Sequence, residues 1–124
     1  MICILLPDGA GALGRFLAKE LSMPFFSHRE IAAQLAEMTG GSPALQQSTA
    51  RQMLLQEAET WLRMGESCVL ECAGADCSCP GLNELLQALG GTALAVAVPN
   101  GAPTVEEKAA VLQQLRGRLE AAQG

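Results

Sequence analysis

Three short, largely apolar runs constrain the fold of this chain more than any other feature. They cover residues 2–6, 68–72 and 92–98. A strand that is covered on both faces carries apolar residues at successive positions, as strands in the middle of a parallel sheet do. These runs therefore predict central, parallel strands. A fourth extended segment is predicted at residues 23–26, because Pro24 disfavours helical backbone in the residue before it.

Amphipathic segments separate these runs and predict helices, because their apolar residues recur at helical spacing. Ser27 with Glu30, and Thr104 with Glu107, match the capping box of a helix start. Ser42 precedes a proline, which is the pattern of an N-cap residue followed by Pro at the first helical position. The predicted helices cover residues 12–21, 28–39, 43–64, 82–89 and 105–119.

Alternating strands and helices predict the α/β class. The expected architecture is a three-layer α/β/α domain with a short parallel sheet, and residues 1–124 form a single domain. Val105 and Ala109 are predicted on the buried stripe of the last helix. The residues predicted to be buried in the core are Leu54, Val69, Leu70, Val96 and Leu112.

The charge of the chain excludes several classes of function. Net charge is −5, and the eight Lys and Arg residues are scattered along the sequence. Nucleic-acid binding needs clustered positive charge, so we expect none. The longest apolar runs fall far short of the roughly 18–20 residues that span a bilayer, so we expect no membrane segment. Five cysteines without a recognisable secretory signal predict a cytoplasmic protein with free thiols.

The order of the segments resembles a known family. The first strand runs into Asp8-Gly9-Ala10-Gly11 and then a helix, and this arrangement resembles the start of cytidylate-kinase-like proteins, a branch of the P-loop nucleoside monophosphate kinases. Residues 17–26, 29–43, 67–76 and 93–99 are similar to the segments that follow there. Shikimate kinases are the second-closest match. The resemblance covers about residues 1–100, and it rests on several weak motifs in the right order.

The resemblance implies a P-loop NTPase-like fold with a phosphate-binding loop between the first strand and the first helix. It also implies that Arg51 contacts a substrate, if the shikimate-kinase alignment is used. Asp76 follows the third predicted strand, where ligands of α/β domains bind. The ligand-binding residues expected on these grounds are Gly9, Ala10, Gly11, Gly14, Arg15, Arg51 and Asp76.

The chain departs from the family at the residues that phosphoryl transfer needs. The loop lacks the Lys that reaches the terminal phosphates and the Ser or Thr that holds Mg²⁺. It is also about two residues short against either family. Arg15 carries a positive charge but lies about a turn further into the helix. The Gly-Arg that ends the third strand in that family is Cys72-Ala73 here, and the arginine-rich lid is missing.

These departures predict a degenerate, noncatalytic kinase-like domain. We expect it to bind an unknown protein partner, or a phosphate-containing small molecule weakly, without a resident cofactor. One alternative is an active nucleotide or small-molecule kinase with an atypical phosphate loop, which would use ATP and Mg²⁺. Another alternative is a cysteine-based metal or redox protein.

The cysteine alternative rests on four thiols within twelve residues, because four thiolates can hold Zn²⁺ or an iron–sulfur cluster. Their spacings do not match the usual zinc pairing. We therefore predict that Cys3, Cys68 and Cys72 belong to the core and that Cys77 and Cys79 are loop thiols, with no metal site.

Two further polar residues stand out. His28 is the only histidine, and it is predicted to be an exposed residue in the first turn of a helix. Glu71 is the only charged residue in an otherwise apolar run. It points either to the edge of the sheet or into the cleft at the strand ends, and the sequence leaves both directions open.

Overall fold

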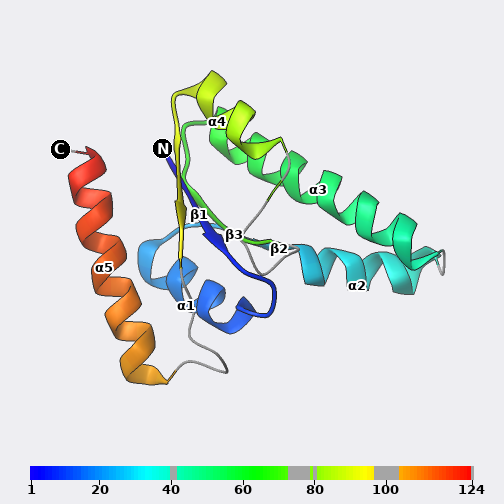
Figure 1. Cartoon of the computed structure of the whole chain (residues 1–124), viewed down its shortest axis with the longest axis horizontal. Helices are drawn as coiled ribbons and strands as arrows, with labels where there is room; N and C mark the ends of the chain where they lie inside the picture. Colours follow the sequence, from blue (N-terminus) through cyan, green and yellow to red (C-terminus); the bar gives the residue numbers. More distant parts are fainter. Residues whose placement is uncertain (40–41, 73–78, 80, 97–103, 124) are drawn as a thin grey trace.

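A computed structural model of the chain describes residues 1–39, 42–72, 79, 81–96 and 104–123. Strands and helices alternate along the described chain (Figure 1). The strands are β1 (Ile2–Leu6), β2 (Phe25–Ser27), β3 (Cys68–Glu71) and β4 (Thr92–Ala95). The helices are α1 (Gly11–Leu21), α2 (His28–Thr39), α3 (Pro43–Arg63), α4 (Leu82–Leu89) and α5 (Val105–Gln123).

The four strands form one sheet in the order β2-β3-β1-β4, and all neighbouring pairs are parallel. The prediction of parallel pairing between the three apolar runs is therefore confirmed. The prediction that all three are central is wrong for residues 92–98, because β4 lies at one edge of the described sheet, pairs only with β1, and has exposed residues at both of its ends. β2 begins two residues later than residue 23 predicts, and β4 ends at Ala95, before residues 97–98, which lie outside the described residues.

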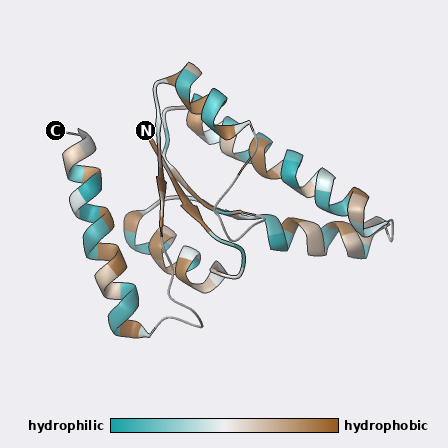
Figure 2. Ribbon diagram, in the orientation of Figure 1, coloured by the Kyte–Doolittle hydropathy of each residue, from teal (hydrophilic) through white to brown (hydrophobic). Residues whose placement is uncertain are grey.

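Helices cover both faces of the sheet, which accounts for the unbroken apolar character of β1. Alternate residues of β1 belong to two separate core clusters. Ile4 packs on one face with residues of α1 and α5, and Cys3 packs on the other face with residues of α3 and α4. Figure 2 shows the hydrophobic residues concentrated in the strands and on the inner faces of the helices. This arrangement is the predicted three-layer α/β/α architecture.

The predicted core residues are buried, whereas the predicted stripe of the last helix is wrong at its start. Leu54, Val69, Leu70, Val96 and Leu112 are all less than a tenth exposed. Val105 is 82% exposed, and Ala109 is also exposed. The first turns of α5 lie beyond the sheet (Figure 1), so the helix reaches the core only through its later residues, among them Leu112 and Leu115.

Helices α2 and α3 pack against each other and extend beyond the sheet (Figure 1). We refer to residues 31–39 and 42–50 of this pair as the arm. Ser42 begins α3 as predicted, because its hydroxyl accepts a hydrogen bond of 3.2 Å from the Leu45 N–H. In the part of the chain that the structure describes, no helix combines the length and the apolar character that a membrane span needs.

Gly14 lies inside α1, on the buried side of the helix that packs against the sheet. A Cβ at this position would lie 2.3 Å from Cε2 of Phe25 and 3.0 Å from Cδ1 of Leu6. Such contacts are far below normal van der Waals separation, so a side chain here forces its neighbours to move. Close packing of α1 on β1 and β2 therefore depends on Gly14 having no side chain.

We expect Gly14→Ala to lower the free energy of unfolding by about 1–2 kcal/mol, because overpacking outweighs the gain in helix propensity. Gly117→Ala in α5 is the matched control, since a Cβ there meets nothing within 4 Å. That variant should be more stable by about 0.5–1 kcal/mol. Urea unfolding of both variants measures the difference. Stabilisation by both substitutions would contradict the close approach at Gly14.

Candidate functional site

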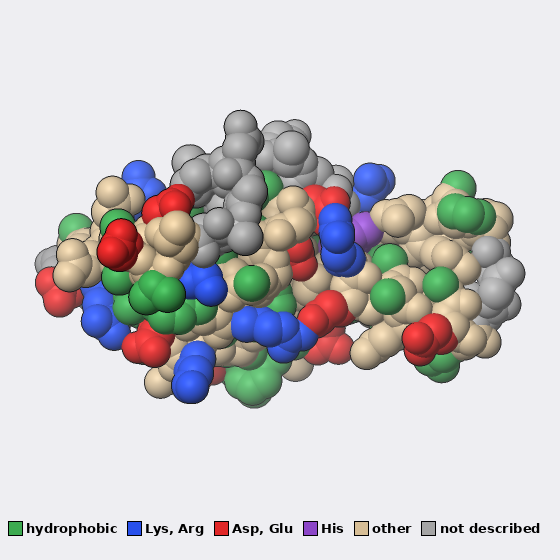
Figure 3. All heavy atoms as spheres, turned by 90° about the horizontal axis from the view of Figure 1, so that it is seen from below, with side chains coloured by type: hydrophobic (Ala, Val, Ile, Leu, Met, Phe, Trp, Pro, Cys, Tyr) green, Lys and Arg blue, Asp and Glu red, His purple; other side chains and the backbone are tan. Residues whose placement is uncertain are grey.

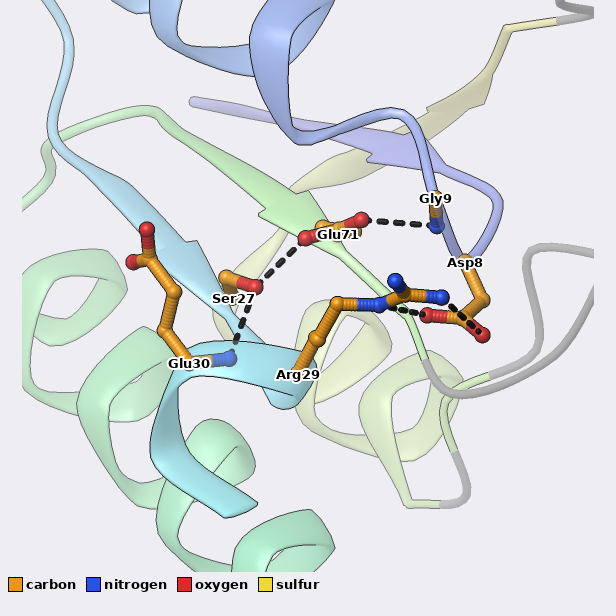
Figure 4. A network of polar contacts seen from close by, with 6 residues as sticks. All are labelled: Asp8, Gly9, Ser27, Arg29, Glu30 and Glu71. Carbon is orange, nitrogen blue, oxygen red and sulfur yellow. Dashed lines mark hydrogen bonds and ion pairs between the residues drawn. The ribbon is translucent and has the colours of Figure 1, made fainter. Parts of the chain in front are cut away.

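The parallel sheet brings the carboxyl ends of β1, β2 and β3 to one edge. The loop after β1 (residues 7–10), the junction of β2 with α2, and the last residue of β3 meet there. Six residues from these three places form a connected polar group (Figure 4). We call them the strand-end cluster, and they are Asp8, Gly9, Ser27, Arg29, Glu30 and Glu71.

Glu71 lies at the centre of this cluster and is only 2% exposed. Its Oε2 accepts a hydrogen bond of 2.8 Å from the Gly9 N–H, and its Oε1 accepts one of 2.5 Å from the Ser27 hydroxyl. A Cβ at Gly11 would lie 3.3 Å from Oε1, so the start of α1 also closes in on the carboxylate. Of the two directions that the sequence left open, Glu71 takes the one into the cleft.

Ser27 links Glu71 to the start of α2. Its hydroxyl donates to Glu71 and accepts a hydrogen bond of 3.2 Å from the Glu30 N–H. The predicted N-cap role of Ser27 is confirmed. The Glu30 carboxylate, however, points away from the helix start and forms an ion pair with Arg15.

The second predicted capping box, at the start of α5, is formed in both directions, because the Thr104 and Glu107 side chains each accept a hydrogen bond from the other residue's N–H.

Arg15 and Arg29, the two arginines at the strand ends, are already paired with carboxylates of the chain. Arg15 lies over the Phe25 ring, 5.4 Å from its centroid, in addition to its contact with Glu30. Arg29 donates from two nitrogens to the two carboxylate oxygens of Asp8, at 3.2 Å each (Figure 4). The hydrogen bond and the charge of Asp8 raise the pKa of Arg29, and the charge of Glu71 adds to this effect. The positive charge at this edge is therefore compensated within the chain.

Two open hollows lie at the strand ends. The larger of these two, about 390 Å³, is the strand-end hollow. The other measures about 300 Å³ and is lined by Asp8, His28, Arg29, Ala32 and Gln47. The residues that line the strand-end hollow are Gly9, Gly11, Ala12, Arg15, Ser27, Arg29, Glu30 and Glu71.

The prediction that His28 is exposed is wrong, because this side chain is only 4% exposed. Its Nε2 lies 3.4 Å from the backbone oxygen of Gln47, which places the imidazole between the start of α2 and helix α3. Packing of α3 on α2 buries a residue that the local pattern places in a solvent-exposed first turn. The sequence contains no signal for this burial, since Gln47 is 19 residues away.

The sequence-predicted site residues fall into three groups. Gly9, Gly11 and Arg15 line the strand-end hollow, and Ala10 directly precedes α1 between them. Gly14 lies one turn into α1 and is buried against the sheet. Arg51 is exposed on α3 and lines neither of the two hollows, and Asp76 lies outside the described residues.

Five residues of the strand-end hollow were not among the predicted site residues. They are Ala12, Ser27, Arg29, Glu30 and Glu71. Two signals were available in the sequence: the capping box marked Ser27 and Glu30, and the charge in an apolar run marked Glu71. Neither signal shows that these residues meet the loop after β1, because that meeting depends on the order of the strands.

Three of the described cysteines lie in the core, as predicted. Cys3, Cys68 and Cys72 are fully buried, and the Sγ atoms of Cys3 and Cys68 are 3.7 Å apart on neighbouring strands. Cys79 is half-buried against the same cluster, and Cys77 lies outside the described residues. Within the described ranges, no three Cys, His, Asp or Glu side chains are close enough to hold a metal ion together.

Burial should keep these thiols unreactive. The hydrogen bond with Cys68 and burial raise the pKa of Cys3, and burial raises the pKa of Cys79. The hydrogen bond with Cys3 lowers the pKa of Cys68, so only its complete burial protects the Cys68 thiol. A raised pKa lowers the thiolate fraction at a given pH, and the thiolate is the reactive form. We expect iodoacetamide at pH 8 to leave Cys3, Cys68 and Cys72 unmodified in the folded protein and to modify them after guanidinium unfolding. Peptide mass spectrometry measures this, and rapid labelling of the folded protein at Cys3 would contradict it.

The fold of this chain is similar to that of a solved structure. A protein from Chloroflexus aurantiacus described as a "putative kinase" matches with a TM-score of 0.74. The match covers 97% of this chain and 96% of that chain, at 18% sequence identity. This chain has a kinase-like fold. No protein-family model and no curated protein matches the sequence. At this identity the likeness concerns the fold, and the function has to be inferred from the site.

Proposed function

We propose that this chain is a degenerate P-loop kinase-like domain that does not transfer phosphoryl groups and acts as a binding domain. The observation that carries the proposal is the position of Glu71. Its buried carboxylate accepts the hydrogen bond of the Gly9 N–H, in the loop where a kinase of this type holds phosphates with its backbone N–H groups.

The balance of charge at this loop disfavours a phosphate. Two unit charges about 4 Å apart interact by about 4 kcal/mol at an effective dielectric constant of about 20. A helix N-terminus contributes about 0.3–1 kcal/mol to holding an anion, and up to about 2 kcal/mol in a partly buried site. Repulsion from Glu71 therefore exceeds the attraction that the start of α1 offers to a phosphate.

Side-chain cations do not restore the balance. The loop has no Lys, and the two arginines that line the strand-end hollow are paired with Glu30 and Asp8. A phosphate that recruits Arg15 has to displace a carboxylate that the chain itself supplies. Phosphoryl transfer depends on preorganised positive charge around the transferred group, and this site lacks that charge.

The arm supports a role in binding a protein partner. Met38 is 81% exposed and Leu45 is 64% exposed, and both lie on the arm. Between residues 31 and 50 the sequence has one charged residue, Glu37. Figure 3 shows hydrophobic and uncharged side chains over the end of the arm, at the right of the view. Interface cores are depleted in charged residues and enriched in Met, and the arm has this composition.

Buried free thiols fit a reducing compartment, and we propose that the protein is cytoplasmic.

The alternative of an active kinase with an atypical phosphate loop has one observation in its favour. The strand-end hollow is open and contains Arg15 and Arg29 beside the start of α1. If ATP–Mg²⁺ displaced the internal carboxylates, these arginines would contact its phosphates. The two functions differ in the affinity for nucleotide that they require.

Isothermal titration with ATP–Mg²⁺ distinguishes them. We expect a dissociation constant above about 1 mM, which corresponds to less than about 4 kcal/mol of binding free energy. Micromolar binding that is abolished by Arg15→Ala would contradict the noncatalytic proposal and favour the active kinase. Arg63→Ala is the matched control, because Arg63 is equally exposed and paired with Glu59, but lies at the end of α3 away from the hollow.

A further inference from the structure

The Glu71 carboxylate is bound by its own chain in the way that an anionic ligand is bound. It has a backbone donor from the loop after β1, a hydroxyl donor from the β2–α2 junction, and a glycine where the start of α1 comes closest. These groups come from two separate segments, since Gly9 and Gly11 belong to one continuous stretch and Ser27 lies at the β2–α2 junction. They converge on a carboxylate that is 2% exposed.

The surroundings of the carboxylate have room for a larger anion once the side chain is shortened. The strand-end hollow of about 390 Å³ opens directly beside Glu71 and is lined by Gly9, Gly11 and Ser27. The hollow is many times larger than the roughly 30 Å³ that a water molecule occupies in the liquid, so it has room for a small oxyanion. Arg15 and Arg29 line the same hollow. The donors that hold Glu71 therefore face an open space, and its two arginines are paired with Glu30 and Asp8.

We propose that Glu71 is an internal ligand that occupies the anion-binding position of the loop and thereby excludes phosphate groups from it. Shortening this side chain opens the position to free inorganic phosphate. This inference rests on the proposed noncatalytic function and names the residue that enforces it. The contact is autoinhibitory, because the same Gly9 N–H and Ser27 hydroxyl that could hold a phosphate oxygen are used up by Glu71.

The glycine at position 11 is consistent with this role of Glu71. A Cβ there would lie 3.3 Å from Oε1 of Glu71, closer than most real Cβ contacts. Glycine thus allows the start of α1 to approach whatever anion occupies the position, whether it is the internal carboxylate or a free oxyanion. The backbone of α1 begins at this residue, so the start of the helix lies beside the carboxylate.

The test compares Glu71→Ala with two matched variants during unfolding in inorganic phosphate and in sodium chloride of equal ionic strength. Glu71→Gln keeps the shape of the side chain and still fills the position. Glu66→Ala removes the same charge at an exposed residue outside the cluster. We expect saturable stabilisation of Glu71→Ala by phosphate. At about ten times its dissociation constant, phosphate lowers the unfolding equilibrium constant about elevenfold. The wild type, Glu71→Gln and Glu66→Ala should show no saturable effect.

Each other outcome contradicts the inference. If phosphate stabilises Glu71→Ala no more than Glu66→Ala, the opened position does not bind phosphate. If phosphate stabilises Glu71→Gln as much as Glu71→Ala, the negative charge of Glu71 excludes phosphate, and the space that its side chain fills does not. Should Glu71→Ala fail to fold, Glu71→Ser takes its place, since it also shortens the side chain and keeps a polar group beside the uncovered donors. Tight binding of ATP–Mg²⁺ by the wild type would refute the proposed function. Absence of phosphate stabilisation in Glu71→Ala would refute this inference alone.

Discussion

Replacing Leu54 with Ala lowers the free energy of unfolding by about 2–5 kcal/mol, which is the range for emptying a buried leucine site. Leu54 is 2% exposed on α3 and packs in the core cluster on one face of the sheet, together with Leu70 of β3. The cost has two parts: the lost transfer of the side chain out of water, and the cavity that the rigid sheet cannot fill.

Leu45→Ala is the control for this prediction, because Leu45 lies on the same helix and is 64% exposed. It should change the free energy of unfolding by less than about 0.5 kcal/mol. Chemical unfolding followed by circular dichroism measures both variants, provided that the denaturant slope stays the same. Similar losses in the two variants would show that α3 does not pack on the sheet through Leu54.

A second large loss is expected for Glu71→Ala, even though a buried charge is removed. The substitution leaves the Gly9 N–H and the Ser27 hydroxyl without their acceptor. The buried Ser27 hydroxyl costs about 1–3 kcal/mol when it loses its partner, whereas the N–H of the exposed Gly9 can bind water, and relief from burying a carboxylate offsets part of the sum. We therefore expect a net loss of about 1–3 kcal/mol in the free energy of unfolding.

Two controls separate this effect from a general change in charge. Glu71→Gln retains an acceptor oxygen in the same place, so it should lose less than Glu71→Ala. Glu66→Ala should change stability by less than about 0.5 kcal/mol, because Glu66 is exposed. Thermal and urea unfolding in chloride buffers give the comparison. A Glu71→Ala protein as stable as the wild type would mean that the cluster does not hold the three strand ends together.

The two Glu71 measurements, in chloride and in phosphate, have different meanings. Loss of stability in chloride reports that the carboxylate pairs with the Gly9 and Ser27 donors. Recovery in phosphate reports that these donors can also donate to an external oxyanion. A purely structural role of Glu71 predicts the loss without the recovery. The autoinhibitory role predicts both.

Much of the fold follows from local patterns. The unbroken apolar residues of β1 predict a strand covered on both faces, and both faces of β1 are covered in the structure. The N-caps at Ser27, Ser42 and Thr104 are predictable for the same reason, since a cap is a contact between residues three positions apart. Patterns of this range are contained in the sequence itself.

The arm and the start of α5 show where local patterns are insufficient. Periodic apolar residues predict a helix, but they do not say whether another element lies opposite. Val105 continues the stripe of α5 and yet is 82% exposed, because the helix begins beyond the sheet. Met38 continues the stripe of α2 and is 81% exposed on the arm. Burial depends on what packs against a face, and the tertiary structure decides this.

The site depends on tertiary structure most of all. From the sequence alone, the missing Lys and the glycines of the loop after β1 predict a poor phosphate site. That Glu71 fills the loop is a different matter, because Glu71 lies 62 residues from Gly9 and 44 residues from Ser27. These residues meet because β3 inserts between β1 and β2, which brings three strand ends to one edge. The sequence determines which chemical groups are present, and strand order determines which of them meet, since hydrogen bonds between distant segments form only once the sheet has assembled.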